Sequence, residues 1–198
     1  MAKRNPREQE VDKGAMHFAA KKDLFEIQRG NNFEFVLPDD TFKSLTPYGA
    51  NKTGKKLNDS AEMIRLSVSS ASIPYYNQQV IEVRRGNTAV KYAGPISYGA
   101  GSIKCYDFIG AGTKDILMAW QARSGDPLSQ RVGQQSAYKM NCNLLEYTPD
   151  YTEIVRTWIV EGCWISDMSD DGYSVDSGGS AKQVSVTIQF DRAYPIYD

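Results

Sequence analysis

The alternation of hydrophobic and polar residues along this chain predicts strands in several segments, and the longest hairpin pattern lies at 75–95. The stretch reads YYNQQVIEVRRGNTAVKYAGP, with its two halves joined at Gly86-Asn87, a pair typical of a tight turn. Side chains in a strand alternate between two faces, so an ordinary half-exposed hairpin has one apolar and one polar face. The first strand would instead set Val80, Glu82 and Arg84 on one face and Gln79, Ile81, Val83 and Arg85 on the other. Both faces combine apolar and charged residues, which raises the question of what covers them.

A second long hairpin is predicted at 138–161, with its turn at Thr148-Pro149-Asp150. Its strands are contained in AYKMNCNLLEY and TEIVRTWIVEGCW, and again both faces are partly apolar. On the first strand, alternation sets Lys139, Asn141 and Asn143 opposite Met140, Cys142 and Leu144. We expect the second set to face the core.

Shorter strand patterns occur on both sides of these hairpins. DLFEIQRGNNFEFVLP predicts two short strands around Gly30-Asn31-Asn32, and MIRLSVSSAS, GSIKCYDFIG and KQVSVTIQFDRAY each predict one strand. An acidic, glycine-rich connection is expected from Ser166 to Gly179. Strands therefore dominate the predicted fold.

One segment, TKDILMAWQARSG at 113–125, has a helical pattern. Thr113 is suited to cap its first turn, and Gly125 followed by Pro127 ends it. Ile116, Leu117 and Trp120 fall on one stripe that should pack against a sheet. The predicted class is mainly β (α+β): an antiparallel β-sandwich or partial barrel with one flanking helix.

The remaining segments divide the chain into an arm and one domain. Residues 1–22 show no sustained period and are expected to form an N-terminal arm that orders only against a partner. Residues 23–198 would form the domain, with an extended polar loop at 39–61. Loops of that length in compact domains are usually functional or bound to something.

Composition excludes several classes of protein. The charged residues, 23 basic and 24 acidic, give a net charge of −1, so no overall field favours nucleic acid or anionic membrane. The N-terminal segment lacks the apolar core of a signal peptide, and no run approaches the roughly 18 apolar residues of a membrane span. We therefore expect no membrane anchor.

Catalytic and metal-binding patterns are weak. The only histidine, His17, lies in the arm, which leaves nucleophilic catalysis without a placed base. DMSDDG at 167–172 matches the opening of a calcium loop, but its twelfth position is Gly178 where a bidentate glutamate is needed. The odd number and wide spacing of Cys105, Cys142 and Cys163 predict buried structural thiols in a reducing compartment.

Several of these segments, taken in order, resemble the tail tube proteins of contractile-tailed bacteriophages, the T-even-like tail tube family. The resemblance covers about Phe25 to Tyr197 and differs by a longer N-terminal arm and by the 39–61 loop. It is carried by RLSVSSASIP through VKYAGP, by DILMAWQARSG, by YKMNCNLLEY and IVEGCWISDMS, and by QVSVTIQFDRAYP.

This resemblance implies a structural virion protein, with no enzymatic activity and no cofactor. Subunits of the family assemble as hexameric rings that stack into the inner tail tube, the conduit for genome ejection, and their long hairpins join in a ring-wide β-barrel. The implied partners are other copies of the chain and the tail sheath, baseplate and tape-measure proteins, while DNA transits the lumen without specific binding. The implied location is the virion, after synthesis in the host cytoplasm.

The resemblance also suggests roles for particular residues. A conduit for DNA should not be basic, because each neutralised phosphate adds affinity, so Asn141, Asn143 and Glu153 are candidates to face the lumen. Arg84, Lys91 and Lys139 would then have to be paired or lie near a ring interface. The ring-stacking candidates are Lys52, Lys55 and Lys56, and the aromatic core candidates are Trp120 and Trp164.

Three alternatives remain open at this point. The chain could be the tube protein of a bacterial contractile injection system, or a single-ring initiator or terminator of a tube. From a different class, it could be a β-sandwich binding module whose site is the calcium-like loop.

Overall fold

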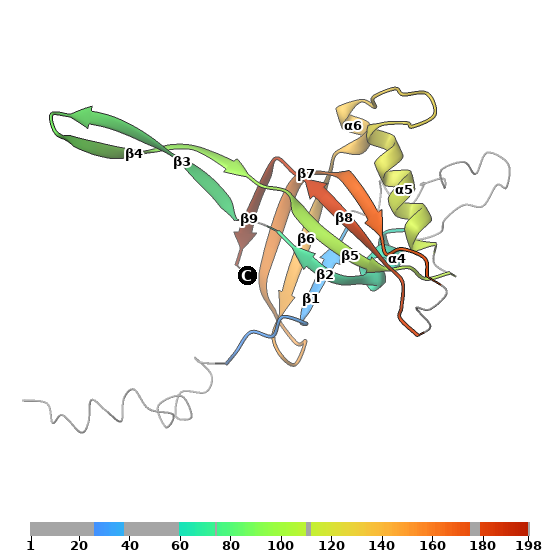
Figure 1. The fold of residues 1–198 in the computed structure, drawn as a ribbon. Coiled ribbons are helices and arrows are strands. Elements are labelled where there is room, and N and C mark those ends of the chain that lie inside the picture. The colour runs from blue at the N-terminus through green and yellow to red at the C-terminus, as the bar shows by residue number, and fades with distance from the viewer. Residues whose placement is uncertain (1–25, 38–59, 74, 110–111, 175–178, 198) are drawn as a thin grey trace, which may run out of the picture.

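Two β-sheets make up most of the structure, a computed structural model that describes residues 26–37, 60–73, 75–109, 112–174 and 179–197 (Figure 1). The larger sheet contains β1 (Phe33–Val36), β2 (Val68–Ser72), β5 (Gly101–Tyr106), β6 (Met140–Tyr147), β7 (Ile154–Asp170), β8 (Gln183–Gln189) and β9 (Arg192–Ile196). The smaller sheet is the hairpin of β3 (Tyr76–Arg85) and β4 (Thr88–Tyr98). The helices in the described ranges are α4 (Ser60–Ser67), α5 (Thr113–Ser124) and α6 (Gln135–Tyr138).

The 17-residue strand β7 holds the larger sheet together. Its first half pairs with β6 on one edge and β9 on the other, and its second half pairs with β8. The order is β1-β6-β7-β8-β5-β2, all pairs are antiparallel, and the outer strands β1 and β2 contact each other. The sheet therefore curves back toward closure, and the predicted mainly β, antiparallel class is confirmed.

The core lies inside this curved sheet and beneath α5. Strands β5 and β8 alternate strictly between buried and more exposed residues, as expected for a sheet with one face inward. Helix α5 contributes Ile116, Leu117 and Trp120, each at most 2% exposed. Other buried members of the cluster are Phe35, Ile64, Ile103, Cys105, Val160, Ile165, Val184 and Val186.

The segment MIRLS is helical, so the strand predicted from Met63 is wrong in its first half. Residues 60–67 form α4, and the strand begins only at Val68. Ser60, Ala61, Ile64 and Ser67 are the buried residues of α4, and their spacing of three and four is that of one helix face. The predicted 39–61 loop thus loses its last two residues to α4, while its positions up to 59 lie outside the described residues.

Helix α5 is confirmed, with a different start. Its N-cap is Gly112, at φ 64°, and no side chain caps it. Thr113 is buried instead, and its Oγ1 lies 3.0 Å from Oγ of Ser67 on α4. The helix ends as predicted, where the Gly125 N–H donates to the Gln121 carbonyl. The sequence predicted one helix; α4 and α6 are additional.

The hairpin predicted around Gly30-Asn31-Asn32 does not form. Residues 26–29 contain no strand, and β1 pairs with β6 across the sheet. Asn32 is 2% exposed, and its side-chain amide donates to the Thr148 carbonyl at 2.8 Å. This turn therefore anchors the edge of the sheet. The proposed 1–22 arm lies outside the described residues.

Candidate assembly surface

The β3–β4 hairpin projects away from the body of the subunit (Figure 1). Its strands pair with each other, and within the described residues neither pairs with the larger sheet. Every residue of β3 is exposed, as is most of β4. Arg85 faces Thr88, which leaves a two-residue turn in which Gly86 has φ 63°, a conformation that favours glycine. The predicted hairpin and its turn are confirmed.

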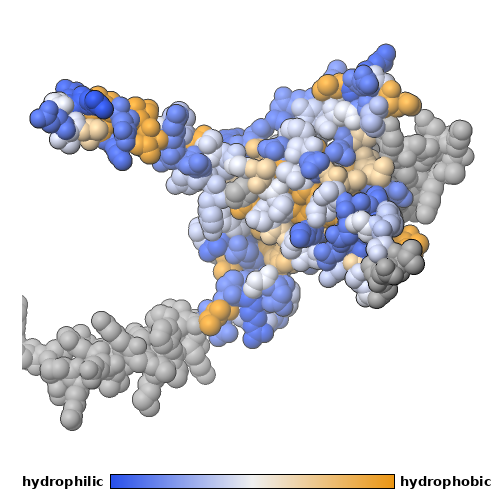
Figure 2. All heavy atoms as spheres, in the orientation of Figure 1, coloured by the Kyte–Doolittle hydropathy of each residue, from blue (hydrophilic) through white to orange (hydrophobic). Residues whose placement is uncertain are grey.

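The register of this hairpin collects its apolar residues on one face. Ile81 is opposite Tyr92, and Val83 is opposite Val90. Opposed residues share a face, as do residues two apart, so these four form one patch, which we call the apolar face. Their exposed fractions are 47% for Ile81, 39% for Val83, 40% for Val90 and 50% for Tyr92. Figure 2 shows hydrophobic residues lying open along the projecting hairpin.

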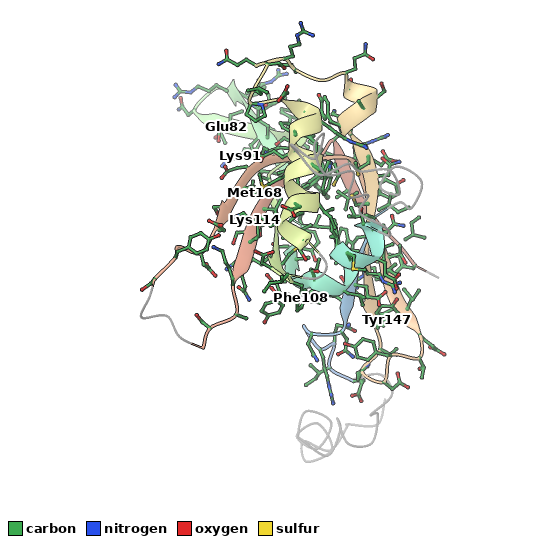
Figure 3. The ribbon with its side chains drawn as sticks, turned by 90° about the vertical axis from the view of Figure 1, so that its right-hand side faces the viewer. Glu82, Lys91, Phe108, Lys114, Tyr147 and Met168 are labelled. Atoms are coloured by element: carbon green, nitrogen blue, oxygen red, sulfur yellow. The ribbon has the colours of Figure 1, made fainter. Side chains whose placement is uncertain are left out.

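The opposite face of the hairpin carries the charges. Glu82 is opposite Lys91, with 3.3 Å between its Oε1 and the lysine Nζ, and Figure 3 shows the two side chains close together. Arg84 is opposite Ala89 on the same face. We call Glu82, Arg84, Ala89 and Lys91 the polar face. The pairing that the sequence required for Lys91 is present, although an exposed pair contributes little stability.

Within the residues that the structure describes, the subunit covers neither face of this hairpin. The resemblance to tail tube proteins implies that one face of this hairpin points to the lumen and the other to the subunit's own core, and the exposure of β3 contradicts the second placement for the described chain. Only the base of the hairpin is held, where the ring of Tyr75 meets that of Trp158 edge-on at 5.4 Å. The sequence of β3 alone predicted two mixed faces. In the paired hairpin, β4 places Tyr92 and Val90 beside Ile81 and Val83, and Lys91 beside Glu82, so one face is mainly apolar and the other mainly polar.

The second predicted hairpin, β6–β7, does not project and forms the middle of the larger sheet. Met140 and Cys142 are buried and Leu144 is partly buried against the core, while Asn141 and Asn143 are exposed on the outer face. The alternation predicted for this strand is therefore observed. Lys139 is also paired, with its Nζ 2.7 Å from the Asp191 carboxylate.

The structure separates Glu153 from the two asparagines. Glu153 lies in the turn between β6 and β7, next to Ile154. Asn141 lies at the other end of β6, six residues before Tyr147, which is about 20 Å along a strand. The three lumen candidates therefore include one pair on a common face and one distant carboxylate.

Asn141 has a local contact that the sequence did not reveal. Its Oδ1 accepts the Gly162 N–H at 3.2 Å, where the β6–β7 register shifts and Gly162 has φ 69°. A carboxylate can accept the same bond, so Asn141→Asp should leave stability nearly unchanged. Asn141→Leu should lower the free energy of unfolding by about 1 kcal/mol. Urea denaturation measures both, and Asn143→Leu is the control; an equal loss in the control would contradict this role.

The two tryptophans differ in burial. Trp120 is 1% exposed, and its indole N–H donates to the Tyr138 carbonyl at 3.3 Å. Trp164 is half-buried and meets the ring of Tyr138 edge-on at 5.8 Å. Both therefore contact the α6 residue Tyr138, one from α5 and one from β7. Lys52, Lys55 and Lys56 lie outside the described residues.

The opening of the calcium-like sequence forms the end of a strand. β7 continues to Asp170, so Asp167 and Ser169 are strand residues and the connection expected from Ser166 is shorter than predicted. Asp170 is paired with Lys114 and with Lys182, and the hydrogen bond from Lys114 is the main cause that lowers its pKa. Across the described ranges, no group of three or more His, Cys, Asp or Glu side chains could hold a metal ion. None of the described helices is long and apolar enough to cross a membrane.

The three cysteines are free and buried, as predicted. Burial raises the pKa of Cys105 to about 12 and that of Cys142 well above its usual value. Thiolates are the reactive form, so the folded protein should resist a thiol-reactive dye at neutral pH and react with about three equivalents in urea. Absorbance of the released dye anion measures this, and fast labelling of the native protein would contradict the buried placement.

Comparisons with known proteins agree on a tube-protein fold. No protein-family model and no curated protein sequence matches the chain. Among solved structures, it is similar to the tube-terminating cap of the anti-feeding prophage, at 16% identity and a TM-score of 0.62 over 87% of this chain and 92% of that one. A chain of the extended sheath–tube complex of the PVC extracellular contractile injection system matches at 15% identity and TM-score 0.62, over 93% and 99%.

A third structure, from the sheath/tube terminator of the PVC system, matches at 16% identity and TM-score 0.59 over 83% of this chain and 93% of that one. The match covers most of each chain, so the likeness concerns the whole domain. The resemblance read from the sequence is thereby confirmed in fold: this chain has the fold of the tube and tube-terminator components of contractile injection systems.

Proposed function

We propose that this chain is the structural subunit of a contractile-tail tube, in which hexameric rings stack to form the inner conduit for genome ejection. The observation that carries the proposal is the largely exposed β3–β4 hairpin with its apolar face of Ile81, Val83, Val90 and Tyr92. A contiguous exposed apolar surface marks an interaction site. The fold shared with tube components supports copies of the same chain as the partner.

The edges of the hairpin support assembly through strands. The outer edges of β3 and β4 have no strand partner among the described residues, and such edges favour pairing with another chain. A head-to-tail contact that closes by rotation would complete each ring and would join the hairpins into a ring-wide barrel without open edges.

The polar face of the hairpin would then line the water-filled channel up to its tip, where Arg84 and Arg85 would meet a neighbouring copy. Asn141 and Asn143 are uncharged, and Lys91 is paired with Glu82, so most of this surface offers DNA no concentrated positive charge. DNA would transit without specific binding. Glu153 lies too far along β6–β7 to belong to the same patch and is better placed at an interface between copies.

The remaining partners follow from the proposed position. The tube would lie inside the tail sheath, join the baseplate at one end and surround the tape-measure protein during assembly. Its location would be the virion, after synthesis in the host cytoplasm. We propose no enzymatic activity, and the three structures named above, which come from tube or cap components, support this.

A tube or single-ring terminator of a bacterial injection system is the second candidate. The observation that favours it is that the three structures named above come from such systems, two of them from a cap or terminator. Such a tube would pass proteins and no genome. Negative-stain imaging of the purified protein tests the common part: rings or tubes support a tube subunit, and monomers at all concentrations would contradict it. Tubes of indefinite length would favour a tube subunit over a single-ring terminator.

The 39–61 loop is proposed to contact the adjacent ring, through Lys52, Lys55 and Lys56. Deleting residues 46–57 should leave a folded subunit that forms rings but no long tubes. Circular dichroism checks the fold, and tube length is measured on electron micrographs. Tubes of normal length from the deletion variant would contradict a stacking role.

A further inference from the structure

The tip of the β3–β4 hairpin concentrates positive charge. Arg84 and Arg85 lie directly before the turn, and Arg85 is opposite Thr88. All residues of the tip are exposed, and neither arginine has an ion-pair partner among the residues that the structure describes. The nearby Lys91 is already paired with Glu82. Two guanidinium groups are therefore available at the point where the hairpin reaches farthest from the body (Figure 1).

The turn between β6 and β7 concentrates the opposite charge. Asp150 and Glu153 are exposed, and within the described ranges neither is in an ion pair. The turn is fixed by its own hydrogen bonds: Asp150 accepts the Thr148 and Thr152 hydroxyl groups at 2.5 and 2.9 Å, and the Glu153 N–H donates to Thr148 Oγ1 at 3.2 Å. The Thr148 and Thr152 bonds lower the pKa of Asp150. The turn therefore presents preformed negative charge.

Beside this turn lies an exposed apolar strip on β7 and β9. Val155, Tyr194 and Ile196 are 39%, 38% and 41% exposed. Ile196 is opposite Thr157 and Tyr194 is opposite Ile159, so alternation places these two side chains on the same outer face. Val155 lies two residues before Thr157 on β7, where the β6–β7 register shifts. Strand β9 pairs only with β7 in the described chain. The acidic turn is thus followed by an apolar strip along a free sheet edge. The hairpin has the matching arrangement, a basic tip followed by an apolar face.

The tip of the β3–β4 hairpin and the acidic β6–β7 turn cannot meet within one subunit. In Figure 1 the hairpin extends to one side, while the β6–β7 turn lies at the bottom of the body. The perpendicular view agrees: Tyr147, the last residue of β6, lies at the opposite end of the molecule from Glu82 and Lys91 of the hairpin (Figure 3). A contact between the two surfaces therefore requires a second copy.

We propose that the hairpin of one copy docks on a neighbouring copy with Arg84 and Arg85 against Asp150 and Glu153, and with its apolar face over Val155, Tyr194 and Ile196. This inference rests on the proposed self-assembly and specifies the surface that receives the hairpin. The charges align the hairpin and exclude other registers, because opposite charges at an interface steer docking and like charges oppose it. The apolar strip supplies the area removed from water.

A charge-exchange experiment tests the contact. The basic-tip variant is Arg84→Glu with Arg85→Glu, and the acidic-turn variant is Asp150→Arg with Glu153→Arg. Each alone should reduce the assembled fraction, measured by sedimentation and negative-stain imaging, by about tenfold or more, because like charges then face each other. The variant that carries all four changes should assemble again. The matched control, Asp171→Arg with Asp167→Arg, reverses two exposed carboxylates elsewhere and should assemble like the parent.

The outcomes distinguish a failure of the proposed self-assembly from a failure of the proposed docking contact. If the parent chain never assembles, the proposed function fails. If the parent assembles and both the basic-tip and the acidic-turn variants also assemble, the docking assignment is wrong. It is also wrong if the variant with all four changes is folded by circular dichroism and does not regain assembly. If the variant with all four changes fails to fold, the two double variants are mixed instead. Each double variant should co-assemble poorly with the parent, and the two should co-assemble well with each other. Equal co-assembly in all mixtures would contradict the contact.

Discussion

Replacing Trp120 with alanine is expected to lower the free energy of unfolding by about 3–5 kcal/mol. Trp120 is 1% exposed and lies in the cluster between α5 and the larger sheet. Its indole N–H also donates to the Tyr138 carbonyl at 3.3 Å, so the change removes both packing and a hydrogen bond that ties α5 to α6. Urea denaturation followed by far-ultraviolet circular dichroism measures the loss.

Trp164→Ala is the matched control, since it removes the same side chain from a half-buried site that also contacts Tyr138. The smaller buried area predicts a smaller loss, because the cost of truncation follows the apolar surface and cavity involved. Equal unfolding midpoints for the parent and the Trp120→Ala variant would contradict the core placement of Trp120. A larger loss for Trp164→Ala would contradict the deeper burial of Trp120.

The sequence predicted helix α5 well because three local features agreed there. Ile116, Leu117 and Trp120 recur at helical spacing, and Gly125 ends the helix where the pattern stops. The MIRLS segment failed for the opposite reason: Ile64 and Leu66 alternate like strand residues, whereas Leu66 is 65% exposed and Ile64 is buried on a helix face. Over so short a run, helical and strand periods select overlapping apolar positions.

The register between β3 and β4 could not be predicted from the pattern of either strand alone. Val83 and Arg85 share a face of β3 in the sequence, and the face looks mixed. Pairing adds Val90 opposite Val83 and Tyr92 opposite Ile81, which makes the middle of that face continuously apolar. The register between strands depends on the turn, and a shift of one residue would move every side chain to the other face. The two-residue turn at Gly86 was the signal that could have fixed it.

The candidate lumen residues, whose role stays a prediction, lie on different elements for the same physical reason. Asn141 and Asn143 are two apart on one strand, so alternation alone places them on a common face. Glu153 lies beyond the end of β6, in the turn, where strand alternation no longer applies. The hydrogen bond from Gly162 to Asn141 depends on a register shift between two strands, and one strand's sequence contains no sign of it.

Replacing Val83 with aspartate is expected to abolish ring and tube assembly while leaving the subunit folded. Val83 is 39% exposed on the apolar face, opposite Val90. The hairpin makes no strand pair with the larger sheet in the described chain, so a charge there should cost the isolated subunit little. In the assembly, the same carboxylate would be removed from water against a neighbouring copy without a partner, which is strongly unfavourable.

Val80→Asp provides the control on the same strand. Val80 is 59% exposed and lies opposite Ala93, on the face that also carries Glu82 and Arg84. Because this face is proposed to line the water-filled channel, an added carboxylate there should leave assembly intact. Sedimentation and negative-stain imaging of both variants, at equal concentration and salt, give the comparison. If Val83→Asp assembles like the parent, or if Val80→Asp blocks assembly as completely, the proposed orientation of the hairpin is wrong.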